Sequence, residues 1–375
     1  MPENLPKVLH LLNSLGSGGA ERLVADVTAK LPAYGWAAEI GIIRSEQAIQ
    51  VQCRVHRYWE GSAPSWRTQF PSYIRRTRTI IDQCAPDVIH CHAHNAYLLA
   101  TLASRAPICL TAHLSTLPFW ASKRPQDFLY RFMLRRDALR GRTTLVFLSR
   151  LSARRAQERF RLPEERIAVV PNGVDFSRIR RALHGGSGAV AKDSKPRVVW
   201  VGRLAAQKNP LLVPAIAQRL RSMGLTFEVV VCGEGPLRGA LLRERARLGL
   251  EETVRVVGHV GDVTPYLAAA CCYLSTSAAE GHSIALLEAM AVGLPVVTFA
   301  VPGMREHLEG KGWARLAAPG DVGGLAGMVA EFIRAPGRAL EIGELARREA
   351  SAYSIGHTAE KYVRLYEELL WGWSS

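Results

Sequence analysis

Two glutamates eight residues apart carry the strongest chemical signal in the sequence. Glu280 precedes an apolar helical segment and Glu288 lies inside it, in the stretch AEGHSIALLEAM. A carboxylate among apolar side chains needs a polar partner, because burying it alone is costly. Ribose or sugar hydroxyls could be that partner, and N–H groups at the helix start suit a phosphate. A capped helix with two incidental glutamates is the alternative interpretation.

Two cations precede another predicted helix. Arg203 and Lys208 follow the apolar run Arg197–Val201 in the stretch VGRLAAQKN. A fork-shaped guanidinium beside a compact ammonium suits a diphosphate, because both make strong charge-assisted hydrogen bonds. A pair of solvated surface charges is the alternative.

Glycine-rich turns follow other apolar runs. Gly18 and Gly19 lie in NSLGSGGAE, directly after Val8–Leu12, and Gly233 lies in the similar turn GEGP. Such turns let the backbone approach an anion at a helix N-terminus. Glu21 stands where the dinucleotide fingerprint G-x-G-x-x-G needs its third glycine, so the first turn is not that fingerprint. A tight turn without a ligand is the alternative.

Polar side chains also follow two apolar runs in the first half of the chain, namely His92, His94, Asn95 and His113. An imidazole at the end of a strand can donate or accept a hydrogen bond near neutral pH. The His-x-His spacing can bind a metal, but no third ligand is evident nearby in the sequence. Polar lining of a cleft and satisfied structural histidines are the other interpretations.

Short apolar runs alternate with helical segments throughout the chain, which predicts two parallel sheets covered by helices on both faces. The main predicted strands are Val8–Leu12, Ala38–Ile43, Val88–Cys91, Ile108–Ala112, Thr144–Leu148, Ile167–Val170, Arg197–Val201, Thr226–Cys232, Val254–Val257, Cys272–Ser275 and Pro295–Phe299. In open α/β sheets, ligands bind outside the carboxyl ends of the strands. The candidate site residues follow such runs, except Glu288, which lies inside the next helical segment.

The length of 375 residues allows two hydrophobic cores. Residues 184–196 (HGGSGAVAKDSKP) have no apolar period and predict a linker. We therefore expect one α/β domain over residues 1–183, a second over 197–352, and a C-terminal helix over 353–375 that could cross back to the first domain.

The net charge of +15 says more about partners than about the fold. Residues 119–161 contain twelve Lys and Arg against three acidic residues, with aromatic residues between them. This pattern suits an anionic membrane surface, and a solvated helix face explains it equally well. Nucleic acid is a weaker alternative.

No apolar run reaches the ~20 residues that span a bilayer. The first seven residues lack the features of a secretory signal. Seven scattered cysteines form no CxxC pair and no zinc spacing. We therefore expect reduced thiols and a cytoplasmic protein.

In these motifs the sequence resembles the retaining glycosyltransferases of family 4, which have the GT-B fold of two Rossmann-like domains facing each other across a central cleft. The resemblance covers nearly the whole chain. It rests on GSGGAERLV, VVPNGVDFSRI, VGRLAAQKN, VVVCGEGPLR and EGHSIALLEAMAVGLPVV. The last stretch is an E-x7-E motif, and together with Arg203 and Lys208 it is specific.

The resemblance implies a role for each matching residue. Arg203 and Lys208 would hold the donor diphosphate. Glu280 would contact the transferred sugar, and Glu288 would bind the ribose. His113 would lie near the reacting sugar and the acceptor. Further donor contacts would come from Gly18, Gly19, Gly233, His259, Val260, Ser283, Ile284 and Ala285, and acceptor contacts from His92, His94 and Asn95.

The resemblance also implies a metal-independent enzyme without a cofactor, which uses a nucleotide sugar as substrate and needs no nucleic acid. We expect a UDP-hexose or UDP-N-acetylhexosamine donor, with GDP-mannose as the alternative. The acceptor would be a glycan or a lipid-linked glycan of bacterial surface polysaccharide or lipopolysaccharide synthesis, at the inner face of the membrane. His282 replaces an aromatic residue common in relatives and weakens the assignment of the donor. A nucleotide-sugar epimerase, a non-catalytic GT-B protein, a dehydrogenase and a nucleic-acid-binding protein are the competing classes.

Overall fold

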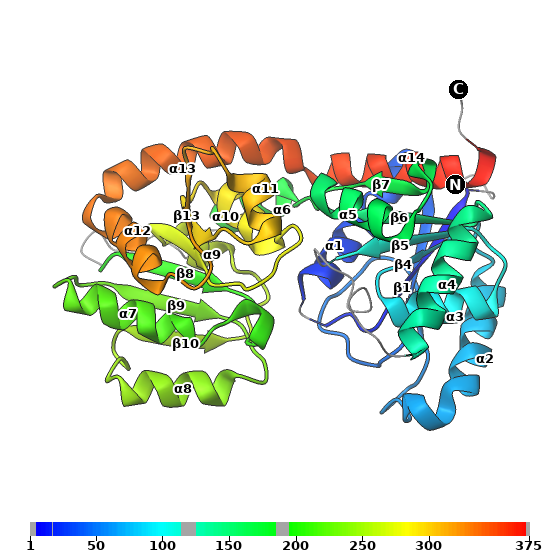
Figure 1. Ribbon diagram of the computed structural model, residues 1–375, viewed down its shortest axis with the longest axis horizontal. Coiled ribbons are helices and arrows are strands. Elements are labelled where there is room, and N and C mark those ends of the chain that lie inside the picture. The colour runs from blue at the N-terminus through cyan, green and yellow to red at the C-terminus, as the bar shows by residue number, and fades with distance from the viewer. Residues whose placement is uncertain (1–4, 17, 114–124, 185–194, 373–375) are drawn as a thin grey trace. The chain divides into compact units, whose positions relative to one another are not determined.

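The computed structural model describes residues 5–16, 18–113, 125–184 and 195–372, and the chain folds into two compact units (Figure 1). Unit 1 consists of Met1–Gly173 together with Ile355–Ser375, and unit 2 of Val174–Ser354. Each unit is a parallel sheet with helices on both faces, as the alternation of the sequence predicts.

The sheet of unit 1 has seven parallel strands in the order β3-β2-β1-β4-β5-β6-β7. The strands are β1 (Lys7–Leu12), β2 (Ala37–Ile42), β3 (Val55–Arg57), β4 (Val88–Cys91), β5 (Ile108–Ala112), β6 (Thr143–Phe147) and β7 (Ile167–Val169). The helices are α1 (Gly19–Thr28), α2 (Trp66–Cys84), α3 (His94–Ala103), α4 (Pro125–Leu139), α5 (Arg150–Phe160) and α14 (Ile355–Trp371).

The sheet of unit 2 has six parallel strands in the order β10-β9-β8-β11-β12-β13. The strands are β8 (Arg197–Val201), β9 (Glu228–Cys232), β10 (Val254–Gly258), β11 (Cys272–Ser275), β12 (Val296–Phe299) and β13 (Ala314–Ala317). The α-helices are α6 (Phe176–His184), α7 (Leu212–Ser222), α8 (Arg238–Arg247), α9 (Thr264–Ala268), α10 (Ile284–Val292), α11 (Pro302–Leu308), α12 (Val322–Arg334) and α13 (Pro336–Ala350).

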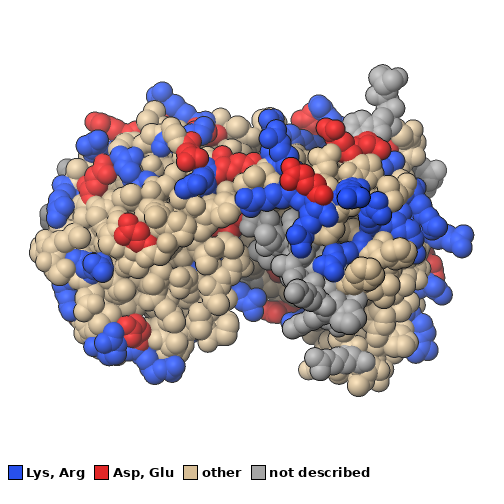
Figure 2. Space-filling view, viewed as in Figure 1, with Lys and Arg blue, Asp and Glu red and all other residues tan. Residues whose placement is uncertain are grey.

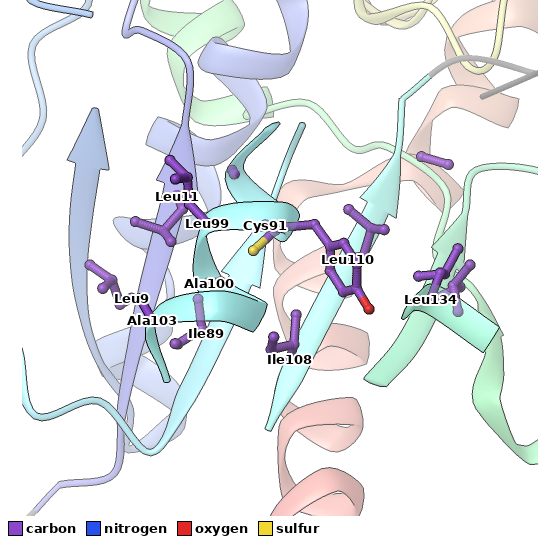
Figure 3. Packing of buried hydrophobic residues seen from close by; sticks show 14 of the residues in the cluster. Leu9, Leu11, Ile89, Cys91, Leu99, Ala100, Ala103, Ile108, Leu110 and Leu134 are labelled. Carbon is purple, nitrogen blue, oxygen red and sulfur yellow. The ribbon is translucent and has the colours of Figure 1, made fainter. Parts of the chain in front are cut away.

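One face of the sheet in unit 1 is apolar and covered by α3. Alternate residues of a strand point to the same face, so Leu9 and Leu11 of β1 lie beside Ile89 and Cys91 of β4. Figure 3 shows these side chains with those of Leu99, Ala100 and Ala103 from α3 and Leu110 from β5. All of them are buried, and this cluster is the main hydrophobic core of the unit.

The opposite face of the same strands carries the buried polar side chains of His10, His90 and Thr111 and packs against α14. His90 lies between Ile89 and Cys91 in β4 and therefore points away from α3. Its Nδ1 lies 2.6 Å from the hydroxyl of Tyr366 and its Nε2 lies 2.7 Å from the hydroxyl of Thr111. Tyr362 also reaches Thr111, at 3.3 Å. These buried pairs tie α14 to unit 1.

The boundaries of the units differ from the predicted ones. The predicted first domain ended at residue 183 and so included most of α6, but this helix packs on α9 and α10 and belongs to unit 2. The division falls at Gly173, where the chain enters a strand-like bridge between Val174 and Ser354. Of the predicted linker at 184–196, residues 185–194 lie outside the described residues.

None of the helices in the described ranges is long and apolar enough to cross a bilayer.

Candidate functional site

The order of strands reverses once in each sheet. In unit 1, β1 lies between β2 and β4, and in unit 2, β8 lies between β9 and β11. Ligands of open parallel sheets bind at the carboxyl ends of the strands at such a switch point. In unit 2 the loops at this point carry Arg203 and Lys208 after β8 and Glu280 after β11.

The loops after β8 and β11 are joined by side chains and backbone. Thr276 donates its hydroxyl to the carbonyl of Lys208 at 2.8 Å. The side-chain amide of Gln207 donates to the backbone carbonyl of Ala279 at 3.0 Å. The backbone carbonyl of Gln207 accepts from the backbone N–H of Ala278 at 2.8 Å. The two loops therefore form one rigid edge of the site.

Lys208 and Glu280 form an ion pair across this edge. The hydroxyl of Ser277 also donates to Oε1 of Glu280 at 2.8 Å. Glu280 is 5% exposed, so its charge depends on these partners. The structure thus brings together two of the predicted catalytic residues, in one cluster.

Arg203 differs from Lys208 because its side chain is exposed. It makes no ion pair with any residue in the described part of the chain. Its guanidinium is therefore available to an anion at the end of β8. Lys208 is thus paired with Glu280, whereas Arg203 has no carboxylate partner among the described residues. Arg203 can therefore bind an incoming anionic group while Lys208 is still paired.

Glu288 has a protein partner that the sequence did not reveal. Its side chain is buried in α10, and Nη2 of Arg178 lies 2.5 Å from its Oε1. Nη1 of Arg178 lies 3.3 Å from the carboxylate of Asp262. The sequence predicts ribose or sugar hydroxyls as the polar partner of Glu288, whereas in the structure Arg178 is bound to this carboxylate.

The start of α10 carries three of the predicted donor contacts. Ser283 is the N-cap and its hydroxyl accepts from Leu286 N–H at 3.4 Å. Ile284 and Ala285 follow in the first turn, where backbone N–H groups have no partner inside the helix. This geometry suits an anion or a sugar oxygen.

The remaining donor contacts lie on loops. Gly233 has φ of +153°, and a side chain there would meet the carbonyl oxygen of Gly202 at 1.9 Å. Glycine is therefore required at 233 by the packing of two loops, whatever it binds. His259, which is exposed, and Val260 follow β10. Gly18 caps α1, which begins at Gly19.

In unit 1 the structure brings together His92 and His113, which follow β4 and β5. Nδ1 of His92 lies 3.0 Å from Nε2 of His113. His92 is also hydrogen-bonded to His10 of β1: Nε2 of His92 lies 2.9 Å from Nδ1 of His10. His94 and Asn95 instead open α3, where His94 is exposed and its ring lies 6.3 Å from that of Tyr130.

His10 is a further functional candidate that sequence reasoning missed. It lies within the apolar run of β1, and only the pairing with β4 places it beside His90 and His92. The three histidines offer nitrogens within 4.8 Å of one another, a spacing found in metal sites. Both nitrogens of His90 are already bonded to Tyr366 and Thr111, so a metal ion would have to displace those bonds.

Acid will destabilise unit 1, because its buried histidines fold in the neutral form. Burial lowers the pKa of His10 from 6.5 to about 3 and that of His113 to about 4. Below pH 6.5 the unfolded chain therefore binds protons that the folded chain does not. The stabilisation is complete above pH 6.5 and is lost as the pH falls, down to about 4 for His113 and about 3 for His10. From pH 7.5 to 5.5 we expect a loss of about 1 kcal/mol for each such histidine.

Urea titrations at these two pH values will measure that loss. The variant His10→Asn should show a smaller dependence than the wild type, because it has one histidine fewer to protonate on unfolding. An equal dependence in both proteins would contradict the assignment of the effect to this cluster.

Comparison with known proteins places these features in context. The family described as Glycosyltransferase Family 4 matches residues 17–178, and that described as Glycosyl transferases group 1 matches residues 195–335. The chain is 32% identical over 378 residues to a 2-deoxystreptamine N-acetyl-D-glucosaminyltransferase of Streptomyces fradiae, covering 92% of this chain and 84% of that protein.

Another relative is the UDP-Gal:α-D-GlcNAc-diphosphoundecaprenol α-1,3-galactosyltransferase of Escherichia coli, at 25% identity over 58% of each chain. The structure resembles that of Anabaena HepE in complex with UDP and glucose, with a TM-score of 0.76 at 21% identity, over 96% of this chain and 99% of that one. It also resembles WaaG, a glycosyltransferase involved in lipopolysaccharide biosynthesis, with a TM-score of 0.75 at 18% identity, over 96% and 99% of the two chains. The structural likenesses confirm the predicted GT-B fold.

Proposed function

Because the chain belongs to the family 4 glycosyltransferases, we propose that it moves a hexose or N-acetylhexosamine from a nucleotide sugar to a glycan or lipid-linked glycan, with retention of configuration and without a metal ion. The family match and the relatives support glycosyltransferase activity in glycan or polysaccharide biosynthesis. We propose, beyond this, the class of donor, the retention of configuration, the independence from metal and the class of acceptor.

The observation that carries the proposal is the ion pair of Lys208 and Glu280 at the switch point of unit 2, with the exposed Arg203 on the same loop as Lys208. A diphosphate that arrives at the end of β8 meets the exposed guanidinium of Arg203 first. It then competes with Glu280 for Lys208. Two fixed cations stabilise the charge that develops on a departing diphosphate, which is the task of a metal ion in other enzymes.

Retention requires the new bond to form on the face that the diphosphate leaves. The bond between the anomeric carbon and the phosphate oxygen breaks, and its electrons go to the diphosphate. The acceptor hydroxyl bonds to the anomeric carbon, and its proton passes to the departing phosphate oxygen. Glu280 is held by Lys208 and Ser277 and serves as a hydrogen-bonding group for the sugar. Trapping of a covalent glycosyl–Glu280 adduct would refute this assignment.

A UDP-linked donor is favoured over GDP-mannose. The curated relative from Escherichia coli is named for UDP-Gal, and HepE was solved with UDP and glucose. Both are statements about those proteins, and they support the same donor class here. His282, which is buried beside His307 with ring centroids 4.2 Å apart, lies two residues after Glu280 and could tune the choice of sugar.

A lipid-linked acceptor is supported by the surface of α4. Phe128 and Phe132 are 67% and 58% exposed on this helix, which also carries the exposed Arg135, and the exposed Arg140 follows its last residue. Figure 2 shows that Lys and Arg outnumber Asp and Glu on the visible face of unit 1. Exposed aromatic rings among cations suit the boundary of an anionic membrane. Part of the predicted segment 119–161, residues 119–124, lies outside the described residues.

Calorimetric titration with UDP and with GDP, without metal, tests the nucleotide part of the proposal. We expect UDP to bind the wild type, and binding to weaken at least tenfold in Arg203→Ala and in Glu288→Ala. Arg247→Ala is the matched control, because Arg247 is exposed and pairs only with Glu244 on α8 among the described residues. GDP binding would support a mannose-type donor. Binding of neither nucleotide would favour a non-catalytic GT-B protein.

A further inference from the structure

Three histidines of unit 1 form a hydrogen-bonded chain that ends at His113. Nδ1 of His10 lies 2.9 Å from Nε2 of His92, and Nδ1 of His92 lies 3.0 Å from Nε2 of His113. The rings come from three neighbouring strands, β1, β4 and β5, or from the residues that directly follow them. Each hydrogen bond between two of these imidazoles needs one donor nitrogen and one acceptor nitrogen. The direction of one bond therefore fixes the direction of the other.

The inner end of the chain is closed. Nε2 of His10 is buried and has no hydrogen-bond partner among the described residues. His90, whose ring centroid lies 5.0 Å from that of His10, cannot serve it, because Tyr366 and Thr111 take both of its nitrogens. The outer end is different, since His113 is only half-buried and its Nδ1 makes no hydrogen bond to the described residues.

All three rings are neutral near pH 7, because burial lowers the pKa of each of them well below that pH. A neutral imidazole carries one N–H. If His113 donates to His92 and His92 donates to His10, the proton of His10 lies on its buried Nε2 and has no acceptor among the described residues. If His10 instead donates to His92 and His92 donates to His113, the buried Nε2 of His10 is an unprotonated acceptor without a donor. Buried N–H groups without an acceptor are rarer than buried acceptors without a donor.

We propose that His10 fixes the tautomer of His113 through His92, so that His113 carries its proton on Nδ1 and acts as a hydrogen-bond donor at the end of β5. His10 and His92 are then positioning residues. This inference rests on the proposed function for its consequence: a donor at His113 would bond to an oxygen of the sugar or the acceptor. The tautomer itself does not depend on any activity.

The test is a two-bond ¹H–¹⁵N correlation spectrum of the full chain labelled at histidine, recorded near pH 7.5. The signals of His113 are identified by their loss in His113→Gln. We expect His113 in the Nδ1–H form in the wild type. An Nε2–H form in the wild type overturns the proposal, and this measurement requires no variant of His10 to fold.

A matched pair of variants then tests the role of His10. The side-chain amide introduced by His10→Asn can donate to His92 in place of Nδ1, so His113 should keep its tautomer. The carboxylate introduced by His10→Asp only accepts, so it should reverse the chain and move the proton of His113 to Nε2. An unchanged tautomer in a folded His10→Asp, with His92 neutral in the same spectra, overturns the proposal. If that variant does not fold, His92→Phe replaces it, and there a mixture of tautomers at His113 is expected while a single Nδ1–H form overturns it.

Kinetics separate this inference from the proposed function. With an active donor, His10→Asp should lower kcat by about tenfold with little change in the KM of the donor, whereas His10→Asn should retain most of the activity. If no nucleotide sugar is turned over by the wild type, the proposed function fails while the spectra still decide the tautomer.

Discussion

We expect Lys208→Met to lower kcat/KM by about 10²- to 10³-fold, the usual effect of removing one preorganised group that stabilises transition-state charge. Methionine keeps the aliphatic stem that packs near Gly202, where Cγ and Cδ of Lys208 lie 3.5 Å from the position of an added side chain. The loss therefore reports the ammonium group. Steady-state rates with a saturating acceptor will measure it.

The double variant Lys208→Met/Glu280→Gln distinguishes two explanations of that loss. Removal of Lys208 alone leaves the buried carboxylate of Glu280 without its cation, which is destabilising by itself. If that were the whole cause, the double variant would be as active as Glu280→Gln alone. If Lys208 acts on the diphosphate, the double variant is less active than Glu280→Gln alone. Lys311→Met is the matched control, because Lys311 pairs with Glu349 on the surface of unit 2 and should be dispensable.

Gly303→Ala is expected to lower both stability and activity, although Gly303 is not one of the candidate site residues. Gly303 lies in α11, and an added Cβ would stand 2.1 Å from the carbonyl oxygen of Glu280 and 2.6 Å from that of Gly281. These are backbone atoms, so the loop that carries Glu280 must move. We expect a loss of about 1–3 kcal/mol in the free energy of unfolding and about 10²-fold in kcat/KM, since a displacement of about 1 Å has such effects.

Gly327→Ala provides the control for this substitution. Gly327 lies in α12 with nothing within 4 Å of an added Cβ, so alanine should stabilise that helix by about 0.5–1 kcal/mol and leave the rate unchanged. Thermal unfolding and kinetics of both variants decide the matter. Wild-type activity in Gly303→Ala would mean that the position of the Glu280 loop does not limit the reaction.

The sheets could largely be predicted from the sequence, because buried parallel strands read as apolar runs. Two strands escaped detection, β3 with only three residues and β13 with the mixed sequence ARLA. The boundary between the units also escaped. It depends on which unit α6 packs against. The sequence of an amphipathic helix predicts which of its faces is buried but not which element covers that face.

The site shows the same division. Arg203, Lys208, Glu280 and Glu288 could be chosen because each follows a strand or interrupts an apolar helix. Arg178 and His10 could not, since their partners are distant in sequence: Arg178 reaches Glu288 from α6, and His10 meets His92 through the register of β1 with β4. Alternation along β1 predicts a buried position for His10 but not the identity of its neighbours.

The path of the chain has a consequence for its synthesis. Unit 2 is one continuous segment, whereas unit 1 needs α14 from the far end of the chain. At the usual rate of translation, Val174–Ser354 takes on the order of ten to forty seconds to emerge. During that time His90 and Thr111 face the surroundings without Tyr366 and Tyr362. The part made first is therefore completed last, and its sheet lacks α14 for as long as unit 2 is being synthesised.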